Sequence, residues 1–212
     1  MNEMCISRRD AVKAASIAAI MLAAGGTVAA LPGKGQAAEA ASGTAKQYGF
    51  LMDTANCVNC GNCATACRNY NDIPEGAAGR RKVVAYEPKK GERAYVSTSC
   101  MHCENPSCAA VCPAGAISKG DGGVVTVDKN KCIGCKYCHQ ACPYGVPRYD
   151  EEGMDKCDCC LGSGVKLGDV PHCVDACHYD ALHYGPVDEL MAAYGDRAKH
   201  IAGPTQPSAW LA

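Results

Sequence analysis

The sequence predicts an α+β fold in which short helices and strands are tied together through cysteine side chains. Three observations lead to this expectation. The 212-residue chain contains 18 cysteines, a density at which a cross-linked or metal-bound scaffold has to be considered. It has one Phe and one Trp beside 10 Tyr, so an ordinary hydrophobic core would be thin. Short segments of strand-like or helix-like pattern lie between the cysteines, as an α+β fold of small elements requires.

Sixteen of the cysteines form four groups along the chain. The groups are Cys57, Cys60, Cys63 and Cys67; Cys100, Cys103, Cys108 and Cys112; Cys132, Cys135, Cys138 and Cys142; and Cys157, Cys160, Cys173 and Cys177. The first and third groups have the spacing C-x2-C-x2-C-x3-C, in which three thiolates bind one cubane cluster and the fourth binds another. The sequence therefore predicts four [4Fe–4S] clusters with these sixteen cysteines as iron ligands. Since the clusters would act as the core, the cluster-free chain should be largely unfolded.

The residues that follow each group predict which groups pair. Pro113 and Pro143 follow the second and third groups, whereas Arg68 and His178 follow the first and fourth. We expect the second and third groups to form an inner two-cluster ferredoxin unit, with the first and fourth groups paired around it. Pairing of neighbouring groups is the alternative. The expected ligand sets are Cys57, Cys60, Cys63 with Cys177; Cys157, Cys160, Cys173 with Cys67; Cys100, Cys103, Cys108 with Cys142; and Cys132, Cys135, Cys138 with Cys112.

Other interpretations of the cysteines fit less well. Zinc modules also use C-x2-C pairs, but they separate the two pairs by about a dozen or more residues. Disulfide-rich exported scaffolds do not repeat the ferredoxin spacing. Cys159 lies between two expected ligands, and neighbouring residues rarely point the same way, so we interpret it as a spare thiol. Cys5 lies outside all four groups.

Residues 1–40 have the layout of an export signal and its cleavage region. Arg8 and Arg9 precede a weakly apolar, Ala-rich stretch, and a small-residue cleavage site follows at 38–40. Adjacent arginines favour the twin-arginine route, although Ala11 stands where Phe is usual. An amphipathic or membrane-spanning helix with a chance arginine pair is the alternative, but the stretch is at the short limit for spanning a membrane. We expect export to the periplasm or to the outer face of the cytoplasmic membrane.

The segment 41–99 should hold the first cysteine motif and a β-hairpin insertion. An apolar run predicts a strand at 48–53, and a helix is expected at about 64–70. Strand-like segments at 81–87 and 93–97 flank a Pro- and Gly-containing turn. The insertion carries basic residues that form either a solvated face or a docking surface. They are Arg80, Arg81, Lys82, Lys89, Lys90 and Arg93.

The rest of the chain is expected to follow in three parts. Residues 100–148 form the inner unit, with a short hairpin after Cys112. Residues 149–185 hold the fourth motif, with a loop at 161–172. Residues 186–212 form a C-terminal helix at about 187–194 and a tail, and acidic residues in the first turn suit the helix dipole. Because 196–212 shows no core-forming pattern, we interpret Trp210 as part of a tail clamped on a partner.

Charge and motifs exclude several classes of function. The formal net charge is −1, and no long run of one charge is present, so nucleic acid is not an expected partner. The chain has no nucleophile elbow, no Gly-rich nucleotide loop and no pterin-sized domain. We expect no catalytic residues and a role in electron transfer. Four of the six histidines lie beside cysteine groups, where they would tune a cluster or lie on the surface, and none is an expected ligand.

Several segments resemble the four-cluster iron–sulfur subunit of the dimethyl sulfoxide reductase family. They are YGF at 48–50, CMHCENP at 100–106, CIGCKYC at 132–138, CPYGVP at 142–147 and GPVDEL at 185–190. The resemblance implies a non-catalytic subunit that relays electrons between an integral-membrane quinol-reactive subunit and a molybdopterin catalytic subunit. Membrane association would be through the partner. The resemblance also implies the crossed pairing of the groups.

One departure from that family concerns the export signal. In dimethyl sulfoxide reductase itself the signal is on the catalytic subunit, whereas here it is on the small subunit. This resembles the ferredoxin-like proteins associated with nitrite reductase. An exported carrier in cytochrome-linked quinol oxidation is therefore the alternative function. A non-redox zinc or disulfide protein is the remote one.

Overall fold

The computed structural model describes residues 46–212, so the predicted export signal lies outside the described residues. The helices and strands are β1 (Tyr48–Met52), α2 (Asn62–Tyr70), β2 (Lys82–Tyr86), β3 (Ala94–Thr98), α3 (Ser107–Ala110), β4 (Ile117–Lys119), β5 (Val125–Val127), α4 (Tyr137–Ala141), β6 (Arg148–Asp150), β7 (Gly153–Asp155), α5 (His172–Asp175), β8 (Leu182–Pro186), α6 (Val187–Tyr194), β9 (Lys199–His200) and β10 (Ala209–Leu211). Short 3-10 turns occur at Asp121–Gly123, Leu161–Ser163 and Gly195–Arg197. None of the helices in this part of the chain combines the length and apolar character needed to cross a bilayer.

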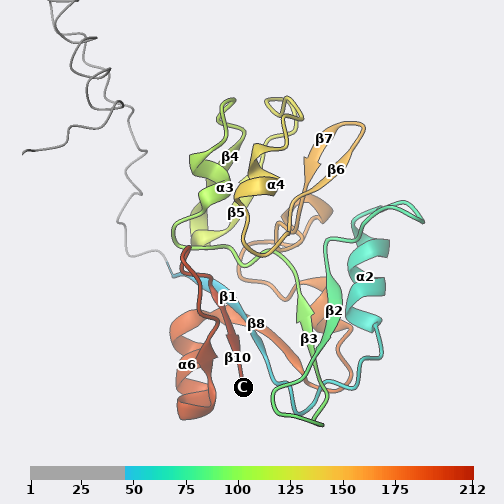
Figure 1. Ribbon diagram of the computed structural model, residues 1–212, viewed down its shortest axis with the longest axis vertical. Helices are drawn as coiled ribbons and strands as arrows, with labels where there is room; N and C mark the ends of the chain where they lie inside the picture. Colours follow the sequence, from blue (N-terminus) through green and yellow to red (C-terminus); the bar gives the residue numbers. More distant parts are fainter. Residues whose placement is uncertain (1–45) are drawn as a thin grey trace, which may run out of the picture. The chain divides into compact units, whose positions relative to one another are not determined.

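A four-stranded sheet joins the two ends of the described chain. Its strand order is β8-β1-β10-β9, with β1 antiparallel to β8 and parallel to β10. Figure 1 shows β10 beside β1 close to the C-terminus. The expectation that the tail clamps a partner is wrong, because Trp210 pairs with Leu51 in register and packs its ring on His200 of the same chain. A three-residue strand is too short to show a periodic pattern, so the sequence did not reveal it.

The remaining strands form three antiparallel pairs. β2 pairs with β3 along its full length, in the region where a hairpin was expected, and its status as an insertion stays a prediction. β4 pairs with β5 within the inner segment. β6 pairs with β7 around a turn that Lys129 braces through ion pairs to Asp150 and Glu152. The β6–β7 pair was not expected from the sequence.

The helices pack in a crossed pattern. α2, in the first cysteine group, packs against α5, in the fourth, and the rings of Tyr70 and His172 stack with their centroids 3.8 Å apart. α3, in the second group, packs against α4, in the third. One helix pair therefore brings the first and fourth cysteine groups together, and the other pair brings the second and third groups together.

Cysteines form much of the core. The larger buried cluster contains Phe50, Met52 and Leu182 among the cysteines Cys63, Cys67, Cys100, Cys157, Cys159 and Cys173. A smaller buried cluster surrounds Cys138 and the fully buried Met154. This composition matches the small aromatic content of the sequence, and it makes the folding of the chain depend on what occupies the space between the thiols.

Candidate metal centres

The first and fourth cysteine groups meet in space. Burial raises the pKa of the Cys57 thiol, and the nearby sulfurs of Cys63, Cys177 and Cys60 raise it further. We call these four residues the first set. Burial also raises the pKa of Cys67, to about 12, and its neighbours Cys157, Cys173 and Cys160 add to the shift. Cys67 and these three residues form the fourth set.

The second and third groups meet in the same crossed manner. One cavity is lined by Cys100, Cys103, Cys108 and Cys142, the second set, and burial together with these neighbours raises the pKa of Cys108 to about 12. A second cavity is lined by Cys112, Cys132, Cys135 and Cys138, the third set. All sixteen predicted ligands therefore lie in sets of four. The alternative, pairing of neighbouring groups, is not the arrangement that the structure has.

The C-x2-C loops share an unusual backbone conformation. The residue just before the second cysteine has a positive φ in all four loops: 58° at Asn59, 42° at His102, 66° at Gly134 and 58° at Cys159. Only Gly134 adopts this conformation without steric cost. Side chains are strained there, and such strain persists where the surroundings demand the conformation. Four different residues in one strained geometry indicate loops shaped for the same ligand.

Cys159 and its neighbour Cys160 both have a positive φ, so position in the loop and side-chain contacts distinguish them. Cys159 occupies the loop position that Asn59, His102 and Gly134 occupy elsewhere, and none of those is a predicted ligand. The Nδ2 of Asn71, which donates to the carbonyl of Cys67, lies 3.8 Å from the sulfur of Cys160. Cys160 therefore belongs with Cys67 in the fourth set, and Cys159 is the residue beside it.

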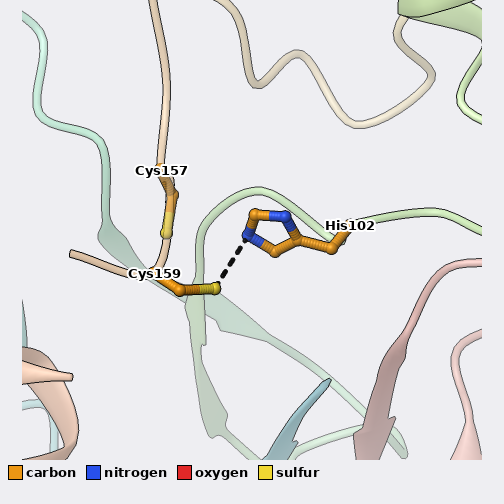
Figure 2. Close-up of side chains that lie close together, drawn as sticks. All are labelled: His102, Cys157 and Cys159. Carbon is orange, nitrogen blue, oxygen red and sulfur yellow. Dashed lines mark hydrogen bonds between the residues drawn. The ribbon is translucent and has the colours of Figure 1, made fainter. Parts of the chain in front are cut away.

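Cys159 is part of a buried hydrogen-bonded chain, and Figure 2 shows its contact with His102 and the neighbouring Cys157. The backbone N–H of Val125 donates to His102 Nδ1 at 3.0 Å, so Nε2 carries the ring hydrogen and donates to Cys159 Sγ at 3.3 Å. Burial lowers the pKa of His102 and keeps the ring neutral. Hydrogen bonding to Cys157, followed by burial, raises the pKa of Cys159, so this thiol keeps its proton. The ligand atoms of His102, Cys157 and Cys159 lie within 4.8 Å of one another, and we interpret the group as a donor chain to Cys157.

Several polar groups that sequence reasoning missed contact the cysteine sulfurs. Ser97 Oγ lies 3.3 Å from Cys63 Sγ, and Tyr149 OH lies 2.9 Å from Cys138 Sγ. Thr205, in the tail, donates from Oγ1 to Cys103 Sγ at 3.2 Å. These hydroxyls come from hairpins and from the tail, so no motif marks them.

Backbone amides add further donors. The amide nitrogens of Ala116 and Ala181 lie 3.3 and 3.4 Å from Cys112 and Cys177, each four residues earlier. The shared C-x3-A spacing is a signal that could have revealed this pair. Hydrogen bonds to cluster sulfurs are among the factors that set reduction potentials.

The predicted basic cluster of the hairpin does not form one surface. Arg80 makes ion pairs with Asp155 at 2.7 Å and Asp158 at 3.2 Å. Arg81 is buried, with 3% of its surface exposed. The basic residues of this region that remain exposed are Lys82, Lys89, Lys90 and Arg93. The basic cluster that the sequence predicts is thus divided between the exposed face of the hairpin and the two less exposed residues Arg80 and Arg81.

The residues present fit iron–sulfur clusters. Sites made only of thiols favour soft metal centres, and the four-fold grouping suits cubanes. Within the described residues, the buried Nε of Arg81 is a side-chain donor with no hydrogen-bond partner. A bound cluster offers sulfide acceptors of the kind that this donor lacks. A buried donor that lacks a partner among the thiols is therefore expected in a protein that folds around an iron–sulfur cluster.

Comparison with known proteins agrees with the assignment of the cysteines to iron–sulfur clusters. Residues 56–116 and 91–187 each match a family described as a 4Fe-4S dicluster domain. The protein is 43% identical over 167 residues to the B subunit of the anaerobic dimethyl sulfoxide reductase of Escherichia coli (strain K12), covering 72% of this protein and 80% of that relative. It is 42% identical over 183 residues to the corresponding subunit from Haemophilus influenzae, covering 77% and 87%.

A further relative comes from a different reductase. The protein is 42% identical over 151 residues to the thiosulfate reductase electron transfer subunit PhsB of Salmonella typhi, covering 68% of this protein and 78% of that relative. The matched residues include the cysteine-rich segments described above. The protein therefore belongs to the family of iron–sulfur electron-transfer subunits that includes the B subunit of anaerobic dimethyl sulfoxide reductase, and it is a [4Fe–4S]-binding, non-catalytic subunit of that kind.

Proposed function

We propose that this protein carries four [4Fe–4S] clusters and relays electrons between an integral-membrane quinol-reactive subunit and a molybdopterin catalytic subunit. The observation that carries the proposal is the gathering of sixteen cysteines into four sets of four. When bound, the clusters accept and release single electrons. The chain's own residues hold them, bury them and donate hydrogen bonds to their ligands. The proposed iron ligands are the sixteen cysteines of the four sets.

Two exposed faces support a relay with two partners. Cys60 of the first set is exposed, and Val58 and Tyr179 beside that set are 52% and 50% exposed. Cys135 of the third set is also exposed, and its neighbour Ile133 is 68% exposed. The loop before α4 is at the top of the view in Figure 1, whereas the loop leading from β1 to α2 is near the bottom. Apolar side chains around an accessible ligand suit partner docking, so we propose one partner at each face.

The nature of the partners rests on the relatives. Two of them are named as the B subunit of an anaerobic dimethyl sulfoxide reductase, and a third as the electron transfer subunit of a thiosulfate reductase. A subunit of this kind needs one partner that supplies electrons and another that uses them. We propose that membrane association is through the quinol-reactive partner, and that the catalytic partner contains molybdopterin.

The proposed location is the periplasm or the outer face of the cytoplasmic membrane. The support is the arginine pair and the A-x-A site within residues 1–40. A signal on this subunit also supports the alternative, an exported carrier in cytochrome-linked quinol oxidation. In both cases the protein would travel folded, with its clusters already in place.

Cluster content tests the central part of the proposal. Anaerobically purified protein would be assayed for iron and acid-labile sulfide per chain, and four clusters' worth of both is expected. Iron for two clusters, or zinc in place of iron, would contradict it. Affinity purification of the tagged chain from membranes would then test the partners. We expect molybdenum to co-purify, and haem without molybdenum would favour the cytochrome-linked alternative.

A further inference from the structure

Among residues 46–212, Arg81 is a buried cation without a carboxylate partner. It precedes β2, and its guanidinium carbon lies 4.6 Å from the centre of the Phe50 ring. Nη1 donates to Ser97 Oγ at 2.9 Å, and Nη2 donates to Ser99 Oγ at 2.8 Å. These partners are neutral. Burying a charge without an opposite charge is costly, so the surroundings have to supply one.

Cysteines of two sets would supply the compensating charge as thiolates, the form in which cysteine binds iron. Burial by itself lowers the pKa of the Arg81 guanidinium, but the sulfurs of Cys173, Cys157, Cys63 and Cys67 outweigh it and raise that pKa above its ordinary value. Cys63 belongs to the first set, whereas the other three belong to the fourth. Arg81 is therefore placed to act on both sets.

The contact with the first set runs through a hydroxyl. Because Ser97 Oγ accepts a hydrogen bond from Arg81, its own hydrogen is free to be donated to Cys63 Sγ, 3.3 Å away. The Nε–H of Arg81 has no partner in the part of the chain that the structure describes. The first set thus receives a hydrogen bond oriented by Arg81, in addition to the field of its charge.

A different buried cation lies beside the second set. Lys156 is 3% exposed, and Nζ donates to the carbonyls of Val125 and Cys157. It lines the cavity of the second set together with Cys100 and Cys108. The second set therefore has a cation of its own and serves as an internal reference for changes at Arg81.

We propose that Arg81 raises the reduction potentials of the clusters in the first and fourth sets, with Ser97 adding to the effect at the first set alone. The inference rests on the proposed four-cluster function. Each one-electron reduction adds a negative charge to a cluster, and a buried positive charge nearby stabilises the reduced state. Net charge and hydrogen bonds to sulfur are established determinants of such potentials.

The test is an EPR-monitored redox titration of the anaerobically purified full chain, with dithionite as reductant and soluble mediators. The variants are Arg81→Gln, Arg81→Lys, Ser97→Ala and Arg93→Gln. Arg93 is exposed just before β3, so Arg93→Gln removes one positive charge from the protein surface and serves as the control for loss of charge. Cys60→Ser and Cys160→Ser assign the signals of the first and fourth sets. Iron content is measured for every variant.

For Arg81→Gln, we expect the ratio of reduced to oxidised cluster at a fixed potential to fall at least tenfold in the first and fourth sets. This corresponds to about 59 mV for a one-electron couple. Arg81→Lys should leave the reduction potentials of these two clusters close to their wild-type values, because it keeps the positive charge. Ser97→Ala should lower the reduction potential of the first-set cluster alone, and Arg93→Gln should leave all the potentials unchanged.

Unchanged reduction potentials in an iron-replete Arg81→Gln variant would overturn the proposal. A shift of equal size in the reduction potentials of all clusters would overturn it as well. If Arg81→Gln fails to retain iron, Ser97→Ala tests the proposal instead, because this variant leaves the charge of Arg81 in place. An unchanged reduction potential of the first-set cluster in Ser97→Ala would then overturn the proposal. Wild-type iron below four clusters' worth would instead contradict the proposed function, so the two failures are distinguishable.

Discussion

At the scale of single residues, the four C-x2-C loops share one backbone conformation at the residue that precedes the second cysteine. The residue before the second cysteine is left-handed in every loop, and Cys159 takes that position in the fourth. Its thiol accepts from His102 and remains protonated beside Cys157. Cys159 is therefore placed as a hydrogen-bond donor within the loop, and its exclusion from the cluster ligands stays a prediction.

Replacing Cys159 by Ser should leave every cluster intact, whereas Cys160→Ser should damage one. A serine hydroxyl can still donate to Cys157, but it cannot replace the thiolate that completes the fourth set. Iron content and EPR of the two reduced variants, prepared in parallel, provide the measurement. Loss of a cluster in the Cys159 variant alone would show that the ligand assignment is wrong.

At the scale of elements, the sheet depends on close approach between β1 and the tail. A Cβ added at Gly49 would lie 2.6 Å from the carbonyl oxygen of Ser208 and 2.7 Å from the ring of Trp210. The tail also reaches the second set, because Thr205 donates to Cys103. A displaced β10 would therefore affect both the sheet and a predicted cluster ligand.

Gly49→Ala should lower the free energy of unfolding by about 1–3 kcal/mol, because a packed strand has to move to admit the methyl group. Gly120→Ala is the matched control, since its Cβ would meet its nearest neighbour, the carbonyl of Val124, only at 3.8 Å. Thermal unfolding of the anaerobic holoproteins measures the difference. Equal stability of the two variants would mean that β10 does not hold β1 tightly.

Elements were predictable from the sequence where the pattern is local. The strand at 48–53 and the helix at 187–194 correspond to β1 and α6. β8 and β10 were missed because their pairing joins Met52 to Leu182 and Leu211 across almost the whole described chain. The four cysteine groups follow from spacing. Arg81, Ser97 and Thr205 could not be predicted, because their contacts depend on how hairpins and tail pack around the thiols.

At the scale of the whole molecule, cysteines take the place of an aromatic core. The main buried cluster combines a few apolar side chains with cysteines from all parts of the described chain. Thiols alone bury little apolar surface, so binding of the clusters contributes to the free energy of folding.

Removal of iron should therefore unfold most of the chain. Anaerobic oxidation with ferricyanide and a chelator would strip the clusters, and we expect far-UV circular dichroism to show loss of helix and strand. The protein treated with chelator alone is the control, since it should keep its clusters and its spectrum. A stripped chain that still unfolds cooperatively on heating would contradict a cluster-dependent core.

Replacing Arg8 and Arg9 together by Lys should strand folded, cluster-loaded protein in the cytoplasm. The arginine pair is an address read by a receptor, so a change that preserves charge should still abolish export. Cell fractionation with iron analysis of each fraction tests this, with the unaltered chain as reference. Export at the normal rate would contradict the twin-arginine assignment.

The crossed arrangement of the sets also has a consequence for synthesis on the ribosome. The second and third sets are complete once Cys142 has been made, whereas the fourth and first sets need Cys173 and Cys177. The first-made cysteines of the four sets are thus the last to find their partners. Until Cys177 has been made, the nascent polypeptide presents Cys57, Cys60 and Cys63 without their fourth predicted ligand. The order in which the predicted sites can be filled therefore runs from the middle of the cysteine region outward.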